Sequence, residues 1–364
     1  MQNKKTNKEL FTLLDKYMSI EGMSRYEDEV AKELKKQTKD SGFKYSRDGM
    51  GSLIMNKIGD ANGPKIMIAA HMDEVGYLVQ DIQDNGQIRL SMVGGVWSHT
   101  VVGASARLIS SNDKVYRGIF GHTSIHILER AKVEKTMKLT EMFVDCGFTS
   151  KKEVEEAGIE PGDRVYMEAN NFVMGKNEEF FVGKSMDNRA GVTIIDQVVN
   201  NLKDEDIKNN LFVVGTVQEE VGTRGAKTSV SQIKPDVAIA IDTCASHDTF
   251  GAIKGIQELG KGIAIRVKDG GTMMDPKLVK FIYDLSKKHK IPCYKFVAQG
   301  GGTDAAELQY GEGGVATITL SIPQRYLHSP HGVCHADDIR AGIDLITEFV
   351  KEFDSESYES IKYK

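Results

Sequence analysis

The hydrophobic and polar positions near the N-terminus follow a helical period and then change to an uninterrupted apolar run. Helical spacing predicts helices over Lys8–Ser19 and Tyr26–Lys39. Ser24 and Glu27 have the spacing of a capping box, which favours a helix start at this point. The run Lys65–Ala70 shows no alternation, as expected of a central strand that is buried on both faces of its sheet. The chain therefore opens with the pattern of an α/β domain.

From Val75 to about Met174 the pattern changes to short stretches in which apolar and polar residues alternate. Such alternation predicts strands, here over Gly76–Ile82, Gln87–Met92, Ala104–Ser110 and Val115–Phe120. Asn-Gly, Gly-Gly and Asn-Asp pairs between these stretches favour tight turns. We therefore expect residues 75–174 to form a small inserted β domain of the barrel type.

After Gly183 the chain returns to apolar strands that alternate with helices. The predicted helices are Asn188–Leu202, Gly225–Ile233, Pro276–Lys290 and Asp337–Phe353, and the predicted strands are Leu211–Val217, Asp236–Asp242, Tyr294–Ala298 and Val315–Ser321. This alternation favours an α/β fold with a mainly parallel sheet flanked by helices. Residues 1–74 and 175–364 are expected to form that domain around the insert.

Composition and charge narrow the functional classes. The 364 residues suit two domains, and 40% hydrophobic with 27% charged residues is typical of a soluble globular protein. A net charge of −5 and no basic run argue against nucleic acid as a partner. No apolar run approaches the roughly 20 residues that cross a bilayer, and the N-terminus has no stretch of signal-peptide length, so a cytoplasmic protein without a membrane partner is expected.

Acidic and imidazole residues gather where predicted strands end, which is the edge of an open α/β sheet where sites form. The five places are His71, Asp187, the pair Glu219 and Glu220, Asp242, and His328. Two imidazoles with several carboxylates are the ligand set that zinc, cobalt or manganese accepts.

Each of these residues alone has an ordinary explanation. A single histidine after a strand is more often a structural residue, a Glu-Glu pair is usually solvated, and Asp187 before a helix could be an N-cap. All five places lie at strand ends, however, and the runs Val213–Val217 and Ala238–Ile241 are too apolar for the following carboxylates to be casual surface residues. Buried charge of this kind requires a cation.

Two other chemistries are weaker. The loop Gln299–Asp304 is rich in glycine but lacks the Lys-Ser/Thr of a phosphate-binding loop. Its free N–H groups around Gly301, Gly302 and Thr303 suit close approach to a substrate instead. No Gly-x-Ser-x-Gly segment surrounds a serine, and the four scattered cysteines show no CxxC spacing, so covalent catalysis, a disulfide framework and a thiolate metal site are not indicated.

Six segments hold the residues named above: Ala70–Gly76, Ser185–Arg189, Val217–Ala226, Ile241–Asp242, Gly301–Ala305 and Arg325–Ser329. In this order, over nearly the full chain, they resemble the tetrahedral aminopeptidases of metallopeptidase family 42, a group that includes glutamyl and deblocking aminopeptidases. The resemblance implies a metalloaminopeptidase that releases N-terminal residues from short peptides. It also implies two divalent ions per chain, zinc or cobalt, with manganese also acceptable.

The resemblance assigns roles to individual residues. Asp187 would bridge the two ions, with His71 and Asp242 on one and Glu220 and His328 on the other. The general base of the family would be Glu219, which takes a proton from a metal-activated water, and Asp73 would orient His71. His126 of the insert and the backbone of Gly301–Thr303 are candidates for contacts with the substrate oxyanion.

Assembly is implied in the same way. The β insert matches the family's dimerisation domain, and its dimers form hollow tetrahedral dodecamers. Met186 stands where the family usually has tryptophan, Ala306 where glycine is common, and Thr123–His126 where Pro-Pro-His is frequent. These departures remove no ligand, but they leave the preferred N-terminal residue and the docking of subunits open.

Two alternatives remain. A related dinuclear deacylase or carboxypeptidase would use the same kinds of ligand, but we expect its extra domain after the third carboxylate, whereas here the insert separates His71 from Asp187. A non-enzymatic assembly protein would be expected to have lost ligands, and none is missing.

Overall fold

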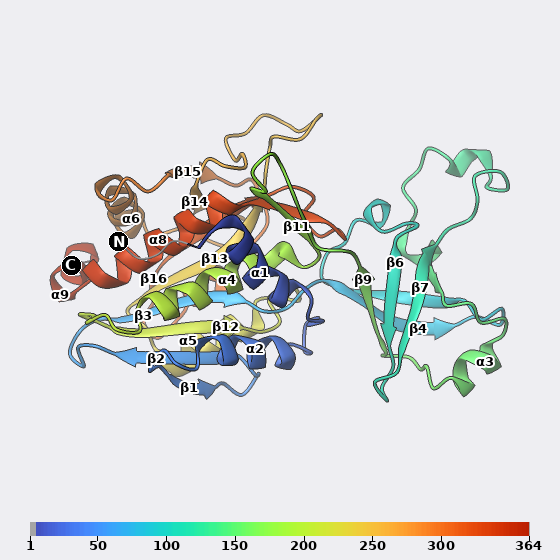
Figure 1. Ribbon diagram of the computed structural model, residues 1–364, viewed down its shortest axis with the longest axis horizontal. Coiled ribbons are helices and arrows are strands. Elements are labelled where there is room, and N and C mark those ends of the chain that lie inside the picture. The colour runs from blue at the N-terminus through green and yellow to red at the C-terminus, as the bar shows by residue number, and fades with distance from the viewer. Residues whose placement is uncertain (1–4, 364) are drawn as a thin grey trace.

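The computed structural model describes residues 5–363, so the ends of the expected α/β domain, residues 1–4 and 364, lie outside the described residues. An eight-stranded sheet forms the centre of the larger part (Figure 1). Its strands, in spatial order, are β1 (Lys44–Arg47), β2 (Leu53–Ile58), β12 (Asn210–Thr216), β3 (Lys65–His71), β13 (Val237–Ala245), β16 (Ala316–Gln324), β14 (Ile263–Lys268) and β15 (Cys293–Val297). The central strands β12, β3, β13 and β16 run parallel, whereas β2 and β14 pair antiparallel with their inner neighbours. The predicted mainly parallel sheet is confirmed.

Helices cover both faces of this sheet. On the face seen in Figure 1, α4 (Met186–Asn201) and α8 (Ala336–Glu352) pack against the central strands, with α1 (Asn7–Met18) and α2 (Asp28–Thr38) against α4. The helices α5 (Arg224–Ile233) and α7 (Ala305–Leu308) pack on the other face, α6 (Pro276–Lys288) covers β14 and β15, and α9 (Ser355–Ile361) ends the chain. Because both faces are covered, β3 and β13 are buried almost throughout.

A closed six-stranded barrel lies beside the α/β part (Figure 1). Its strands, in barrel order, are β4 (Gly76–Ile82), β5 (Ile88–Val93), β8 (Phe143–Asp145), β7 (Val115–Gly121), β6 (Ser105–Ile109) and β9 (Arg164–Glu168), and α3 (Lys151–Glu156) precedes β9. The barrel has a hydrophobic core of its own, separate from the main core. The strand β10 (Phe172–Met174) pairs with β11 (Phe180–Gly183), which in turn pairs with β17 (Gly332–His335) of the α/β part.

The capping-box prediction for the second helix is wrong. Glu27 is the N-cap of α2, but its side chain makes no cap hydrogen bond. Its carboxylate instead accepts from the backbone N–H of Gln218, 2.9 Å away, and Ser24 Oγ donates to Asp73 Oδ2 at 2.6 Å. The spacing was compatible with a cap, yet both side chains are turned toward a buried acidic cluster at the end of the sheet.

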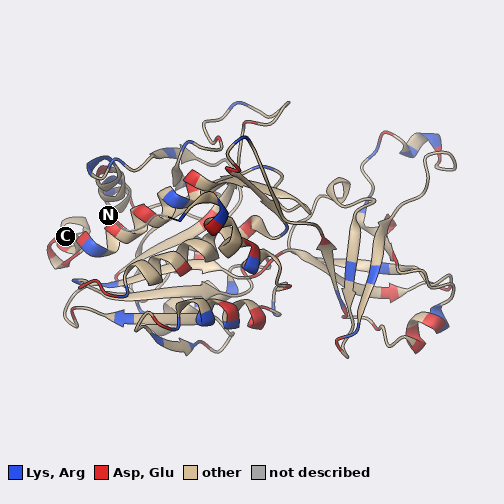
Figure 2. Cartoon of the chain, in the orientation of Figure 1, with Lys and Arg blue, Asp and Glu red and all other residues tan. Residues whose placement is uncertain are grey.

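The structure shows how the charged and apolar residues are distributed. Figure 2 shows Lys and Arg interspersed with Asp and Glu along both parts of the chain, without a broad basic face. Within residues 5–363, none of the helices is both long enough and apolar enough to cross a membrane.

Candidate metal centre

The topology brings the five predicted ligand positions to one end of the central sheet. His71 is the last residue of β3, and Asp242 lies beside it because Ile241 of β13 is paired with Ala70. Glu220 follows β12, His328 follows β16, and Asp187 stands in the first turn of α4. Parallel strands place their carboxyl ends at the same edge, so segments that are far apart in sequence converge here.

Asp187 lies between the two imidazoles. Its Oδ1 is 3.2 Å from His71 Nε2, and its Oδ2 is 3.3 Å from His328 Nε2. His71 Nε2 is also 3.6 Å from Asp242 Oδ1, and His328 Nε2 is 3.2 Å from Glu220 Oε1. Ligand atoms about 2.0–2.1 Å from a tetrahedral zinc lie about 3.3 Å from one another. The spacing of both trios therefore fits a metal ion, and the two trios share Asp187 through different oxygens.

Each imidazole is oriented through its other nitrogen. His71 Nδ1 is 3.1 Å from the carbonyl oxygen of Asp73, and His328 Nδ1 contacts the carbonyl oxygen of Gly95, which follows barrel strand β5. A proton on Nδ1 donated to these carbonyls leaves Nε2 as the ligating atom in both residues. The barrel side of the molecule thus positions one of the two histidines.

The electrostatics of the cluster suit cations. Burial raises the pKa of Glu220 to about 7, and burial together with the Asp187 carboxylate raises the pKa of Asp242. Burial alone would lower the pKa of His328, but hydrogen bonds with Asp187 and Glu220 outweigh it and raise the pKa to about 11. A bound cation would favour the charged form of the two carboxylates and the neutral form of His328, so the residues fit divalent ions.

Asp73 holds the turn that carries the paired glutamates. Its Oδ1 accepts from the N–H of Glu219 at 3.0 Å, and its Oδ2 accepts from the N–H of Glu220 at 3.1 Å. Glu219 offers an oxygen within 4.8 Å of ligand-type atoms of His71 and Glu220. Burial raises the pKa of Glu219 well above its usual range, although His71 opposes the shift. The arrangement suits a carboxylate that takes up a proton.

Sequence reasoning missed two buried acids beside the centre. Asp304 ends the glycine-rich loop, one of its carboxylate oxygens accepts from Thr216 Oγ1, and the other has no hydrogen-bond partner. Burial raises the pKa of Asp304 to about 7, and burial with the nearby Asp73 raises the pKa of Glu27 to about 7. Asp304 stands in the segment Gly301–Ala305, but no local pattern there predicts that its carboxyl group is buried.

The candidates for substrate contact are placed differently from the ligands. A Cβ atom at Gly301 or Gly302 would meet nothing within 4 Å, so this backbone is open to a neighbour. Thr303 is fully buried, and its hydroxyl lies 2.9 Å from that of Thr319. His126 is exposed in the connection after β7, and within residues 5–363 of this single chain it is not among the groups of side chains that have metal-ligand spacing.

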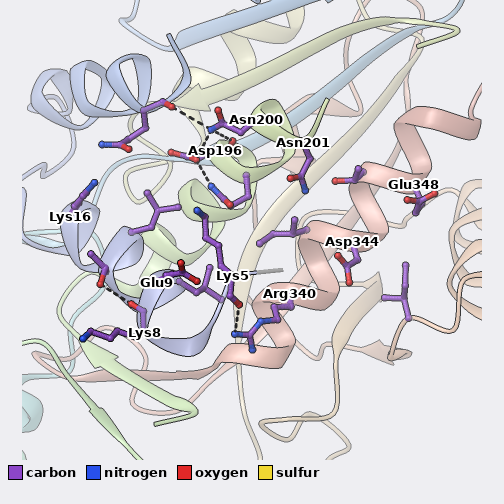
Figure 3. A pocket seen from close by; sticks show the side chains of 18 of the residues that line it. Lys5, Lys8, Glu9, Lys16, Asp196, Asn200, Asn201, Arg340, Asp344 and Glu348 are labelled. Carbon is purple, nitrogen blue, oxygen red and sulfur yellow. Dashed lines mark hydrogen bonds between the residues drawn. The ribbon is translucent and has the colours of Figure 1, made fainter. Parts of the chain in front are cut away.

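Another ligand trio and a polar cavity lie elsewhere in the α/β part, and polar groups of both already have partners within the chain. His289, Glu348 and Glu352 form another trio with metal-ligand spacing, yet Lys288 Nζ is 2.6 Å from Glu352 and already neutralises it. A cavity of ≈ 990 Å³ is lined by residues of α1, α4 and α8, and Figure 3 shows the side chains that line it. Asp196 in it accepts from Asn200 at 3.0 Å, and Arg340 donates to the Lys5 carbonyl oxygen at 3.0 Å, so these polar groups are satisfied within the chain.

Comparisons with known proteins point to one family. The family model for M42 glutamyl aminopeptidases matches residues 51–345. A glutamyl aminopeptidase of Lactococcus lactis is 31% identical over 97% of this chain and 99% of its own. Among solved structures, an aminopeptidase of Desulfurococcus kamchatkensis has a TM-score of 0.93 with 34% identity, covering 98% of this chain and 99% of its own. The TET1 peptidase of Pyrococcus horikoshii, described as able to form a tetrahedron or a large octahedral shell, has a TM-score of 0.84 with 30% identity, covering 94% and 99%.

Proposed function

Since the chain belongs to the M42 glutamyl aminopeptidase family and is an aminopeptidase, we propose that it works through a dinuclear metal centre bridged by Asp187. The observation that carries this proposal is that the two carboxylate oxygens of Asp187 face two different imidazoles, 3.2 and 3.3 Å away. His71 and Asp242 would hold one ion, and Glu220 and His328 the other. Zinc and cobalt suit this mixed set of nitrogen and oxygen ligands best, and manganese is also compatible.

Different residues of the chain would then have different roles in the reaction. When bound, such ions polarise the scissile carbonyl and make a water molecule acidic enough to attack near neutral pH. Glu219 would accept the proton of that water and pass it to the leaving amine. Asp73 would keep Glu219 in place through the hydrogen bond at 3.0 Å. Backbone N–H groups of Gly301–Thr303 are proposed to bind the oxyanion, and His126 is a second candidate for the same role.

Short peptides with a free N-terminus are the proposed substrates, because the substrate amine would lie among the acidic ligands. The glutamyl aminopeptidase of L. lactis makes an acidic N-terminal residue the first to test. We propose measuring turnover of acidic, basic and apolar aminoacyl-nitroanilides by metal-stripped protein resupplied with zinc, cobalt or manganese. Hydrolysis of none of them in any metal form, with N-acylated substrates cleaved instead, would favour the deacylase alternative.

Metal removal is expected to destabilise the protein. Ions that bind only the folded state at about a thousand times their dissociation constant add about 4 kcal/mol of stability. Because each kcal/mol shifts the melting temperature of a domain of this size by about 2–4 °C, metal resupply should raise Tm by on the order of 10 °C. Differential scanning calorimetry of stripped and reloaded protein measures this shift.

A surface variant provides the control for this measurement. His289→Ala removes the imidazole of the outer trio and should leave the metal-dependent shift unchanged. If His289→Ala abolished the shift, the stabilising ions would bind at the outer surface, and the proposed centre would be wrong.

The barrel is proposed as the contact that joins two chains, and dimers of this kind as the units of a tetrahedral dodecamer. Replacing residues 76–168 with a short linker should therefore abolish assembly, because the excised part has its own core and the α/β core remains complete. The excision spares β10, which pairs with β11. Sedimentation velocity measures the outcome, with circular dichroism to check folding. A folded truncated protein that still sediments as an oligomer would place the contact in the α/β part.

A further inference from the structure

The loop between β13 and β14, residues 246–262, carries an apolar tip that the rest of the chain does not cover. Phe250, Ile253 and Ile256 are 109%, 77% and 56% exposed. Figure 1 shows this loop in gold, extending past the strands that it connects. Large apolar side chains gathered on one projection are unusual on a monomer surface and mark a contact with another macromolecule. These three residues are called the loop tip below.

The base of the loop is firmly held, so the tip is presented in a defined position. Arg325 Nε and Nη2 lie 3.0 and 2.6 Å from the two carboxylate oxygens of Asp248. Leu259 packs with Val182 of β11 and Val333 of β17 in a small separate core. A bidentate ion pair and a packed leucine at the base reduce the entropy that the tip would lose on binding a partner.

Hydrogen bonds within the loop hold the backbone around the tip in a turn. The N–H of Ala252 donates to the carbonyl oxygen of Thr249 at 3.1 Å, and His247 Nδ1 lies 2.8 Å from the carbonyl oxygen of Ile253. The N–H of His247 also donates to the carbonyl oxygen of Gln257 at 2.7 Å, which closes the loop across its neck. The exposed side chains are therefore carried by a structured turn.

Symmetry requires a second contact in any assembly larger than a dimer. A two-fold contact uses the same surface on both chains and is complete once two chains have joined. The proposed barrel contact can therefore produce only dimers, and any larger closed assembly needs a second contact outside the barrel. The loop tip belongs to the α/β part, and none of its residues is in the barrel core.

On these observations, and resting on the assembly put forward under the proposed function, we infer that the loop tip is the second contact, packed against a second copy of this chain and joining dimers into a larger closed assembly. The TET1 peptidase of P. horikoshii, whose fold this chain shares, is described as forming closed shells. A second copy is therefore the occupant that requires no further component.

The test is the double variant Phe250→Ser with Ile253→Ser in the full-length, metal-loaded protein. Truncating two central apolar anchors typically weakens association by at least about 100-fold. Sedimentation velocity over a range of concentrations should show dimers where the unchanged protein forms larger particles. Hydrolysis of an aminoacyl-nitroanilide and a single cooperative thermal transition would confirm that the variant is folded.

Matched variants separate a specific contact from general surface hydrophobicity. Ile58 of β2 and Val297 of the edge strand β15 are apolar residues outside the loop, 53% and 56% exposed and thus close to the 56% of Ile256, so Ile58→Ser with Val297→Ser should leave assembly unchanged. Ile256→Asp should reproduce the dimers of the double variant.

The outcomes distinguish the inference from the proposed function. Larger particles in the double variant, identical to those of the unchanged protein, would overturn the inference but leave the assembly proposal intact. Monomers in the double variant would also overturn it, since the tip would then form the dimer contact. An unchanged protein that never exceeds a dimer would overturn the proposed dodecamer and, with it, the second contact.

Discussion

Glu219→Gln should lower kcat by about 10²–10⁴-fold or more while the protein keeps two metal ions per chain. Glutamine preserves the shape of the side chain but cannot accept a proton. Glu219 and Glu220 leave β12 in succession, and both backbone N–H groups are held by Asp73, at 3.0 and 3.1 Å. Their carboxylates nevertheless differ, because Glu220 Oε1 is 3.2 Å from His328 Nε2 within one ligand trio. Turnover of a nitroanilide substrate and metal analysis of the same sample measure both quantities.

Glu220→Gln is the matched comparison, since it makes the same chemical change one residue later. It should weaken the binding of one ion, because an amide oxygen is a poorer ligand than a carboxylate. If Glu219→Gln kept near-normal turnover, or lost metal as Glu220→Gln does, the assignment of the base to Glu219 would be refuted.

Asp187→Ala should lose both ions together and with them all measurable peptidase activity. Without the bridging carboxylate, each ion would retain only one histidine and one carboxylate from the proposed set, which is too few for tight binding. The fold should persist, because the neighbouring Asn188 donates to the Ile241 carbonyl oxygen at 2.7 Å and keeps the start of α4 on β13. Metal analysis after dialysis, with thermal unfolding as a check on the fold, measures the effect.

Asp242→Ala serves as the control, because Asp242 belongs only to the trio that contains His71. Asp242→Ala should weaken the binding of one ion and leave the affinity for the other unchanged. An Asp187→Ala protein that retained one ion at unchanged affinity would show that Asp187 is not a bridge.

The sequence predicted the elements whose pattern is dictated by burial. Central strands such as β3 and β13 are apolar on both faces. The helices α4 and α8 carry apolar residues at helical spacing over 16 and 17 residues. The positions of all four elements were therefore predicted to within a few residues. β1 was not predicted, because this four-residue edge strand is mostly polar. β14 was also missed, since its apolar residues are interrupted by charges that the protein accommodates through local partners, such as Arg266 with Asp269.

The positions of the acidic and imidazole residues could be predicted from the chain, but their mutual geometry could not. Gln218 and His328 have φ angles of 57° and 52°, a left-handed conformation that costs a non-glycine residue about 1–3 kcal/mol and is found preferentially at functional sites. Nothing in local propensity predicts such angles, because packing from distant segments imposes them. The contact between His328 and the Gly95 carbonyl likewise joins two segments whose proximity depends on how the barrel is attached.

The most direct test of the dinuclear centre is a crystal structure of the metal-loaded protein with anomalous diffraction data at the absorption edge of the bound metal. Two peaks are predicted, one among His71, Asp187 and Asp242 and the other among Asp187, Glu220 and His328, with a different oxygen of Asp187 on each. A single peak, or two peaks without Asp187 between them, would contradict the proposed centre.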